Sequence, residues 1–442
     1  MEYKELINII KNKEAKVAVV GLGYVGLPMA AIVASRGYFT TGVDINPDIV
    51  NKVNNKKSPI NEPGLEEIVY KTVEAGKLKA TVEASEIRNS NVVLIIVQTP
   101  VDENKEPRLE ALMSAAKAVA ENLSEGTLVV VESTIPPGTT RNEILPVLES
   151  SGLKAGKDFF LANSPERAIP TKTLEEIQIN SRVVGGIDER SAELAGVFYE
   201  NITSGDVYKD AVEVVEVVKL IENTFRDVNI ALANDVALLC EAIGIDAIKA
   251  INLANKHPRV NFHMPGAGVG GHCIPKDPYF LIKEAEKHGV NLSVIKAARE
   301  RNSDMPFHVL ETLESALKKQ GKDIKKSKVA VLGIAYKGNV DDVRETPAEP
   351  IIKTLMKSGV DVFSHDPYVS QDFGGKFSNE IKTVIKNADA LVIVTDHDEY
   401  KKLNFEDLRL LMKDKAIILD GRRILNPEDI KRLGFTYCGI GC

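Results

Sequence analysis

The chain has 442 residues, of which 44% are hydrophobic and 27% are charged, and its net charge at pH 7 is −7. This length exceeds what a single core supports, and the composition is that of a soluble globular protein, so two or three domains are expected. A nucleic-acid partner is disfavoured because no dense lysine or arginine run occurs, and no apolar run reaches transmembrane length.

The chain begins with an amphipathic segment, residues 1–16, which lacks the continuous apolar stretch of a signal peptide. A cytoplasmic protein without membrane contact is therefore predicted. Four cysteines in a chain of this length do not make a disulfide framework. Cys240 is expected in the core, and Cys438 and Cys442 are expected to be exposed thiols outside any metal site.

Short β-branched apolar runs alternate with helical stretches over roughly the first 200 residues. This alternation predicts a doubly wound parallel sheet. Strands are expected at 16–21, 40–44, 92–97, 128–132 and 182–185, with a helix at 25–35.

The loop after the first strand carries Gly21, Gly23 and Gly26 in the GxGxxG spacing and opens the following helix. The first glycine permits a tight turn, the second lets a pyrophosphate approach the backbone, and the third allows close helix packing. The N–H groups at the helix start would bind the phosphates. Asp44 ends the second strand, about 20 residues further on, where a carboxylate binds the ribose hydroxyls and repels a 2′-phosphate. The sequence therefore predicts NAD rather than NADP.

From 211 to 243 the sequence contains no proline or turn cluster, and apolar residues recur at helical spacing. Val215, Val218, Ile221 and Phe225 fall on one stripe of this predicted long helix. A helix of this length between two domains commonly forms a subunit interface, and burial within one chain is the alternative. Further helices are expected at 247–254 and 292–302.

Lys219 and Asn223 lie one turn apart on the long helix and share a face. Lys219 interrupts an otherwise apolar stretch, and a lysine in such a place either extends its charge to solvent or serves a site. The residues alone leave both interpretations open.

Cys273 lies in a segment with glycines at positions 266, 268, 270 and 271, beside His272, Lys276 and Asp277. So much glycine indicates backbone that is pressed against a ligand or held in conformations closed to other residues. Neighbouring cations favour the thiolate, the reactive form of cysteine, although most free cysteines are small buried hydrophobes. As a nucleophile beside a nicotinamide cofactor, Cys273 would support an oxidation that continues past an aldehyde to an acid.

A second α/β unit begins with the strand expected at 328–333, and its first loop, 333–338, lacks the three-glycine spacing. This loop is expected to bind something other than the dinucleotide. Arg344 and the pair Arg422–Arg423 stand near the strand ends where ligands bind in open α/β sheets. A phosphate contact is one interpretation of these arginines, and an ordinary surface position is the other. Later strands are expected at 360–364, 390–395 and 416–420.

Six motifs, in this order, resemble those of the UDP-glucose/GDP-mannose dehydrogenase family, whose members oxidise nucleotide sugars to uronic acids. They are the glycine loop at 21–26, Ser133-Thr-Ile-Pro-Pro-Gly138, Ser164-Pro-Glu-Arg167, Lys219-x-x-x-Asn223, Gly270-Gly-x-Cys-x-x-x-Asp277 and Asp341-Asp-x-Arg344. The resemblance spans nearly the whole chain and implies two Rossmann-like doubly wound parallel-sheet domains joined by a helical middle domain with a long central helix. The implied domains are an NAD domain (1–205), a central dimerisation domain carrying the cysteine loop (206–315) and a UDP-sugar domain (316–442). A homodimer or a dimer-based oligomer is also implied.

The resemblance assigns roles to single residues. Cys273 would attack the C6 aldehyde as a thiolate, giving a thiohemiacetal and then, after a second oxidation by NAD, a thioester that water hydrolyses. Lys219 and Asn223 would stabilise oxyanions, Asp277 and Thr134 would organise the water, and Glu166 would act as the general base. The implied cofactor contacts are Gly21, Gly23, Tyr24, Val25, Gly26, Asp44, Thr99, Thr134 and Arg344. The implied substrate contacts are Glu166, Arg167, Lys219, Asn223, Gly270, Tyr336, Lys337, Arg344, Arg422 and, from a neighbouring subunit, Arg259.

The substrate is expected to be a UDP-N-acetylhexosamine. Family members of the UDP-glucose branch usually have phenylalanine in place of Val269, no histidine at the position of His272, and a second glutamate in the segment that here reads Pro165-Glu-Arg-Ala-Ile-Pro-Thr171. UDP-N-acetylmannosamine is the first choice and UDP-N-acetylglucosamine the second, with UDP-glucose as a further alternative. Two other functions remain open: a two-electron hydroxyacid dehydrogenase and a non-catalytic NAD-binding sensor or scaffold.

Overall fold

The computed structural model describes residues 3–169 and 171–442. It divides into two compact units, each described by itself. Unit 1 comprises Met1–Glu222 and Tyr279–Gly289, and unit 2 comprises Asn223–Pro278 and Val290–Cys442. Helices α9 (Val212–Ile243) and α11 (Asp277–Lys287) each begin in one unit and end in the other.

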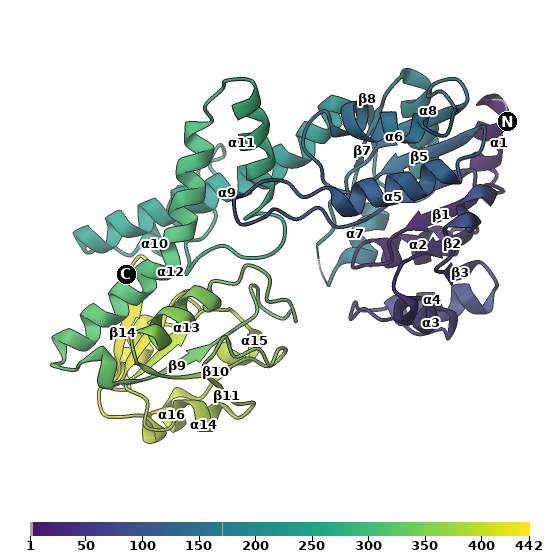
Figure 1. Ribbon diagram of the computed structural model, residues 1–442. Helices are drawn as coiled ribbons and strands as arrows, with labels where there is room; N and C mark the ends of the chain where they lie inside the picture. Colours follow the sequence, from purple (N-terminus) through teal and green to yellow (C-terminus); the bar gives the residue numbers. More distant parts are fainter. Residues whose placement is uncertain (1–2, 170) are drawn as a thin grey trace. The chain divides into compact units, whose positions relative to one another are not determined.

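Unit 1 is built on an eight-stranded sheet in the order β3-β2-β1-β4-β5-β6-β7-β8 (Figure 1). All neighbouring strands are parallel except β6 and β7, which pair antiparallel. The sequence predicted a doubly wound parallel sheet, and the β6–β7 pair is the one exception among the described strands. The strands are β1 (Lys16–Val20), β2 (Phe39–Val43), β3 (Leu78–Thr81), β4 (Val92–Ile95), β5 (Thr127–Val131), β6 (Phe159–Asn163), β7 (Arg182–Gly186) and β8 (Val207–Ala211).

Helices cover both faces of this sheet, because successive residues of each central strand enter different cores. Val17 and Val19 of β1 pack into one core with α2, whereas Ala18 and Val20 pack into a second core with α5. Helix α2 is apolar on all sides, and nine of its ten residues are buried. The helices of unit 1 are α1 (Tyr3–Lys11), α2 (Gly26–Ser35), α3 (Pro47–Asn54), α4 (Leu65–Glu74), α5 (Glu110–Glu121), α6 (Leu145–Glu149), α7 (Thr173–Ile179) and α8 (Glu189–Glu200).

Unit 2 contains a six-stranded, wholly parallel sheet in the order β11-β10-β9-β12-β13-β14. Val329 and Val331 of β9 face a core shared with α12 and α13, and Ala330 and Leu332 face a second core. The strands are β9 (Lys328–Leu332), β10 (Asp361–His365), β11 (Lys376–Phe377), β12 (Ala390–Ile393), β13 (Ile417–Asp420) and β14 (Thr436–Gly439). The helices are α10 (Ala247–Ala254), α12 (Ser293–Lys319), α13 (Ala348–Lys357), α14 (Ile381–Ile385), α15 (Asp398–Lys401), α16 (Phe405–Leu411) and α17 (Pro427–Arg432). The predicted architecture, two Rossmann-like sheets with a helical segment between them in the sequence, is confirmed.

The apolar stripe predicted along α9 does not lie on a single buried face. Val215 is buried and Val218 half-buried, but Ile221 and Phe225 are more than half exposed. An amphipathic pattern predicts that one face of a helix is apolar, but it does not predict whether that face packs within the chain or stays exposed.

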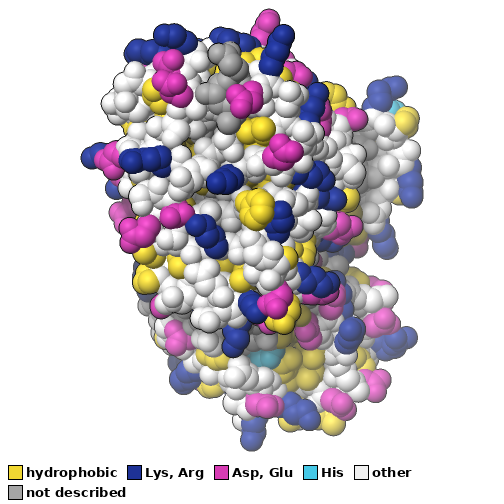
Figure 2. Space-filling model, turned by 90° about the vertical axis from the view of Figure 1, so that its right-hand side faces the viewer, with side chains coloured by type: hydrophobic (Ala, Val, Ile, Leu, Met, Phe, Trp, Pro, Cys, Tyr) yellow, Lys and Arg dark blue, Asp and Glu magenta, His cyan; other side chains and the backbone are white. Residues whose placement is uncertain are grey.

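The surface is mixed in charge. Figure 2 shows basic and acidic side chains interspersed over the face that it displays, with apolar side chains between them. Within residues 3–169 and 171–442, no helix combines the length and the apolarity needed to cross a membrane.

Candidate active site

The glycine loop between β1 and α2 is shaped for a dinucleotide. Gly21 has a φ of +96°, and a Cβ there would lie 2.2 Å from the carbonyl oxygen of Ile96. A Cβ on Gly26 would lie 1.9 Å from the carbonyl oxygen of Gly21, so the third glycine allows the helix to start against the turn. At Gly23, by contrast, a Cβ would meet nothing within 4 Å. The first and third glycines therefore satisfy the fold, and the second leaves open space where a pyrophosphate would approach the backbone.

Asp44 closes this loop from the end of β2. One carboxylate oxygen accepts a hydrogen bond of 2.7 Å from the backbone N–H of Leu22, and the other accepts one of 2.8 Å from Asn46. The side chain is half-buried, so it keeps acceptor capacity facing solvent. A ribose diol would bind to that capacity, and the loop fits NAD. Tyr24 and Val25, beside it, are exposed and half-buried respectively.

Thr99 and Thr134 belong to loops that follow β4 and β5, at the edge of the sheet where the glycine loop lies. The Thr99 hydroxyl donates to the carbonyl oxygen of Thr134 at 2.6 Å. The Ser133 hydroxyl, in turn, bonds to both the N–H and the carbonyl of Val97, at 2.9 and 2.7 Å. These bonds join the two loops, and the structure brings the predicted pair Thr99 and Thr134 together.

Glu166, Arg167 and Lys219 also lie in unit 1. One oxygen of Glu166 accepts hydrogen bonds from the backbone N–H groups of Arg167 and Ala168, at 2.6 and 2.8 Å. The Arg167 guanidinium pairs with Glu222 of α9 and donates to the carbonyl oxygen of Ser181 at 3.0 Å. Arg167 is therefore held by its own unit rather than extended toward solvent.

Lys219 is only 8% exposed, so its charge does not extend to solvent. The two nearest acids on α9 are already engaged: Glu216 accepts the N–H groups of Gly138 and Thr140, and Glu222 pairs with Arg167. Within the described part of the chain, no acidic side chain forms an ion pair with Lys219. Of the two interpretations left open by the sequence, a lysine that serves a site is the one that this burial favours.

In unit 2, the loop that carries Cys273 packs closely against neighbouring backbone and side chains at its glycines. A Cβ on Gly270 would lie 2.7 Å from the Glu345 carbonyl oxygen, and one on Gly271 would lie 2.7 Å from the ring of Tyr336. Gly268 and Gly271 also adopt φ values of +136° and +92°. The glycines therefore let the loop pass tightly over the ring of Tyr336. Of the two explanations that the sequence offered, the positive φ values match backbone held in conformations closed to other residues.

Hydrogen bonds anchor the ends of this loop. The N–H of Gly266 donates to the Asn234 side chain of α9 at 3.0 Å, and the N–H of Gly271 donates to the carbonyl oxygen of Arg344 at 2.9 Å. At the far end, the carbonyl oxygen of Cys273 accepts from the N–H of Asp277 at 2.8 Å. The half-buried thiol of Cys273 is thus carried on a loop with fixed ends.

Asn223 and Asp277 meet directly. The Asn223 amide donates to the carboxylate of Asp277 at 2.6 Å, and both side chains are buried. Lys276 lies 3.8 Å from the other oxygen of Asp277. A buried carboxylate with these neighbours is suited to orient a water molecule beside the loop.

Of the residues predicted to contact the nucleotide sugar, Gly270 and Arg422 lie beside Tyr336 in unit 2. The guanidinium of Arg422 donates to the carbonyl oxygen of Val394 at 2.7 Å, and a Cβ on Gly266 would lie 3.0 Å from it. Among the described residues, no carboxylate forms an ion pair with Arg422 or with the exposed Lys337. Both cations are thus available to an anionic ligand. Arg344 instead forms a bidentate pair with Asp342 through its Nε and Nη2.

Arg423 has a different role from its neighbour. It pairs with Asp246 at 2.8 Å and donates to the carbonyl oxygens of Ile440 and Gly441.

The expectation that Cys438 is an exposed thiol is wrong, because Cys438 is half-buried and burial raises its pKa. Cys442 is exposed and Cys240 is buried, as expected. No group of three or more histidine, cysteine or acidic side chains in the described residues is placed to hold a metal.

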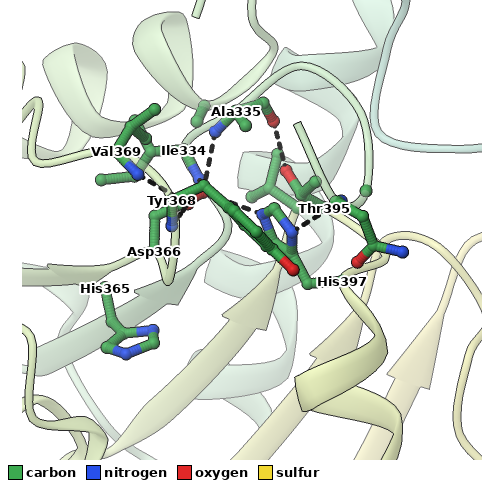
Figure 3. A network of polar contacts seen from close by, with 12 residues as sticks. Ile334, Ala335, His365, Asp366, Tyr368, Val369, Thr395 and His397 are labelled. Carbon is green, nitrogen blue, oxygen red and sulfur yellow. Dashed lines mark hydrogen bonds and ion pairs between the residues drawn. The ribbon is translucent and has the colours of Figure 1, made fainter. Parts of the chain in front are cut away.

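The first loop of the second sheet is closed by its own side chains. Asp366, at the end of β10, accepts the N–H groups of Ile334 and Ala335 at 2.7 and 2.9 Å (Figure 3). The Nε2 of His397 lies 2.9 Å from the same oxygen, and both side chains are buried. The oxygens of Asp366 are therefore occupied by the protein's own donors, whereas the sequence predicted that this loop binds something other than the dinucleotide.

Arg226 was missed in the sequence analysis. It lies on α9 three residues after Asn223 and is exposed, and its positive charge acts on the phenol of Tyr336. The helical spacing could have indicated Arg226, because positions 219, 223 and 226 share one face of a helix.

Arg259, predicted to reach a neighbouring subunit, is exposed, and no ion pair of the described residues involves it.

Comparisons with known proteins give the family. Models for the NAD binding domain, the central domain and the UDP binding domain of the UDP-glucose/GDP-mannose dehydrogenase family match residues 15–203, 213–304 and 330–427. The chain belongs to this family. The predicted cofactor, NAD, is confirmed, and the chain is an NAD-dependent oxidoreductase.

Similar proteins span almost the whole chain. A UDP-N-acetyl-D-mannosamine dehydrogenase of Pyrococcus horikoshii is 42% identical, with 96% of this chain and 99% of the relative covered. The solved structure of the P. horikoshii UDP-D-ManNAc dehydrogenase matches with a TM-score of 0.91 over the same shares of the two chains. A crystal structure of an NDP-N-acetyl-D-galactosaminuronic acid dehydrogenase from Methanosarcina mazei is 36% identical, with a TM-score of 0.87, and covers 98% of this chain and 97% of its own.

Proposed function

We propose that this protein oxidises the C6 hydroxymethyl group of UDP-N-acetyl-D-mannosamine to the carboxylate, with two NAD per sugar. The observation that carries the proposal is the Cys273 loop, whose glycines hold it against Tyr336 and present a half-buried thiol. The name of the P. horikoshii relative supports the choice of sugar. Val269 and His272, which depart from the UDP-glucose pattern, support it as well.

NAD held by the glycine loop and Asp44 supplies the hydride acceptor. The aldehyde produced first is captured by Cys273, whose sulfur forms a bond to C6 while the carbonyl oxygen becomes an oxyanion. Lys219 and Asn223 supply a buried cation and an amide donor suited to stabilise that oxyanion. Covalent capture also prevents loss of the aldehyde before its second oxidation.

Hydrolysis of the resulting thioester requires a positioned water. Asp277, fixed by Asn223, and Thr134 are assigned to orient it, and Glu166 is assigned to take its proton. Lys337, Tyr336 and Arg422 are assigned to the nucleotide sugar, with the unpaired cations of Lys337 and Arg422 facing the pyrophosphate.

The oligomer belongs to the same proposal. Phe225, Leu232, Leu239 and Ile243 are each about half exposed and recur at intervals of seven and four on α9. An apolar row of this kind fits a second copy of the chain, so a homodimer is proposed, in which Arg259 reaches the partner's site. A cytoplasmic location is proposed because four cysteines in a chain of this length do not make a disulfide framework.

The test is NADH release from UDP-N-acetylmannosamine, UDP-N-acetylglucosamine and UDP-glucose, each supplied in limiting amount. Two NADH per UDP-N-acetylmannosamine, with the other sugars nearly silent, is the expected result. Two NADH from another sugar would keep the mechanism and change the substrate. One NADH per sugar, or normal acid formation by Cys273→Ser, would overturn the thiol mechanism.

A further inference from the structure

A buried charged cluster lies behind Glu166 in unit 1. Its members come from four separate elements: Glu132 directly follows β5, Glu166 follows β6, Arg182 begins β7, and Tyr199 lies in α8. Glu132 and Arg182 are 2% and 4% exposed. Charges this deep are costly unless they are paired, so the way in which they are paired is informative.

Arg182 holds the free oxygen of Glu166. The Oε2 of Glu166 accepts from the guanidinium of Arg182, while its Oε1 accepts the two backbone N–H groups of Arg167 and Ala168. The aromatic ring of Tyr199 stacks under the guanidinium, with the centroid 4.4 Å from its central carbon. Arg182 therefore cannot swing away from Glu166 without losing the stacking and uncovering a buried charge.

Glu132 competes for the same guanidinium. Its Oε1 accepts a 2.6 Å hydrogen bond from the Tyr199 hydroxyl. Its Oε2 has no hydrogen-bond partner and lies 3.9 Å from Arg182. One buried cation thus stands between two carboxylates, and only Glu166 makes a direct hydrogen bond to it.

We propose that Arg182 is a positioning residue for Glu166, and that the protonation state of Glu132 sets how strongly Arg182 holds the Glu166 carboxylate. The inference rests on the proposed function, in which Glu166 takes a proton from the hydrolytic water. When Glu132 is neutral, Arg182 interacts with Glu166 alone and holds its carboxylate in place. When Glu132 is ionised, it competes for the same guanidinium, and that hold on Glu166 is weakened.

The surroundings of Glu132 support a change of protonation near neutral pH. Burial raises the pKa of Glu132 to about 7; the charge of Arg182 opposes this rise, and that of Glu166 adds to it. The groups that face Glu132 from the packed elements are Arg182 of β7, Glu166 of the loop after β6 and Tyr199 of α8. Burial also raises the pKa of Tyr199, which therefore stays a neutral donor.

The experiment compares the pH dependence of kcat for steady-state acid formation in the wild type and Glu132→Gln. The wild type is expected to show an inflection near pH 7, and the variant is expected to lose it while the pre-steady-state release of NADH stays within twofold. Tyr199→Phe removes the hydrogen bond that stabilises the Glu132 anion, so it should move the inflection to higher pH. Glu62→Gln, at a buried carboxylate that accepts the N–H groups of Thr171 and Thr173, is the matched control and should leave the profile unchanged.

Arg182→Lys and Arg182→Met test the positioning role itself. Arg182→Lys keeps the charge and should retain the early NADH release while lowering the hydrolytic rate about tenfold, with the covalent adduct on Cys273 visible by intact-protein mass spectrometry. Arg182→Met should lower it further. A uniform loss of all steps with an unchanged pH profile would mean that the cluster is only structural. Failure of the proposed function is recognised separately, because the wild type itself would then release fewer than two NADH per sugar.

Discussion

The first loops of the two sheets begin with the same backbone turn, and the two sheets use the carboxylate beside that loop in opposite ways. Gly21 and Gly333 adopt nearly equal φ values, +96° and +95°, and an aspartate follows the second strand in each unit. Asp44 is half-buried and uses two backbone donors. Asp366 is buried, and backbone N–H groups and His397 occupy it fully. Whether such a carboxylate serves a ligand or the fold is decided by how many of its acceptor sites the protein itself fills.

The largest effect is expected from Asp366→Ala. It would leave the N–H groups of Ile334 and Ala335 and the ring of His397 without their buried acceptor, and about 3–5 kcal/mol of unfolding free energy should be lost. Urea denaturation measures this loss, and NAD affinity of the folded fraction should be unchanged. Asp44→Ala is the matched control and should cost about 1 kcal/mol or less of unfolding free energy. Equal losses of unfolding free energy at the two positions would contradict the conclusion that Asp366 serves the fold and Asp44 serves a ligand.

Gly23→Ala is expected to separate ligand binding from folding. A Cβ at this position meets no protein atom within 4 Å, so the thermal midpoint should change by no more than about 2 °C. NAD affinity should nevertheless fall about 100-fold, because the methyl group would occupy the space of the pyrophosphate. Isothermal titration calorimetry with NAD checks this result. Gly338→Ala, whose Cβ would lie 2.7 Å from the Asp396 carbonyl oxygen, should show the reverse pattern, a lower midpoint with NAD affinity retained.

Asp44→Asn should weaken NAD binding by about tenfold, or roughly 1.4 kcal/mol, because a neutral amide replaces the carboxylate that accepts both ribose hydroxyls. The preference for NAD over NADP should shrink by a similar factor, since the repulsion of a 2′-phosphate is removed. Parallel titrations with NAD and NADP measure both changes. Asp366→Asn should leave the ratio of the two affinities untouched, and a change in that ratio would place the second loop in cofactor binding.

The smallest effect concerns pH. Although burial opposes it, the hydrogen bonds from His397 and the Ala335 N–H lower the pKa of Asp366 below the ordinary aspartate value of 3.8. The folded state therefore binds this proton less tightly than the unfolded state, and the carboxylate contributes stability above pH 3.8 that is lost as the pH falls further. The stability difference between wild type and Asp366→Asn should narrow when urea denaturation is carried out at pH 3 instead of pH 6. If the difference in unfolding free energy between the two proteins were the same at pH 3 and pH 6, the lowered pKa of Asp366 would be contradicted.

Strands β1, β4, β5, β9, β12 and β13 could be predicted because they are buried and rich in β-branched residues. Strand β6 is equally buried but was missed, because its sequence, Phe-Phe-Leu-Ala-Asn, contains no β-branched residue. Strand β8 was missed because its sequence, Val-Tyr-Lys-Asp-Ala, is polar and four of its five residues are exposed. Helix α12 was predicted to end near residue 302, yet it continues to Lys319 through Pro306. Proline normally ends a helix, but Pro306 is buried and packs where Gly268 of the cysteine loop approaches. Tertiary packing outweighs local preference at this position.

The parts of the site that lie within one short segment could be predicted from the sequence. The contacts between segments far apart in the sequence could not. The glycine loops at 21–26 and 266–271 could be read directly because steric limits on glycine are local. The hydrogen bond from Asn223 to Asp277 joins residues 54 positions apart, and no spacing rule links them. Arg182 and Glu132 look in the sequence like the ends of ordinary strands, and only the fold brings them together behind Glu166.

Arg422 and Arg423 are adjacent in the chain, carry the same charge and end in different environments. The left-handed backbone of Arg423, with a φ of +53°, sends its side chain to Asp246 and the carbonyls near the C-terminus, while Arg422 lies beside the cysteine loop. Selection would therefore act on the two positions for separate reasons. In the proposed function, substitution of Arg422 is expected to weaken binding of the nucleotide, whereas substitution of Arg423 is expected to lower the stability of the fold.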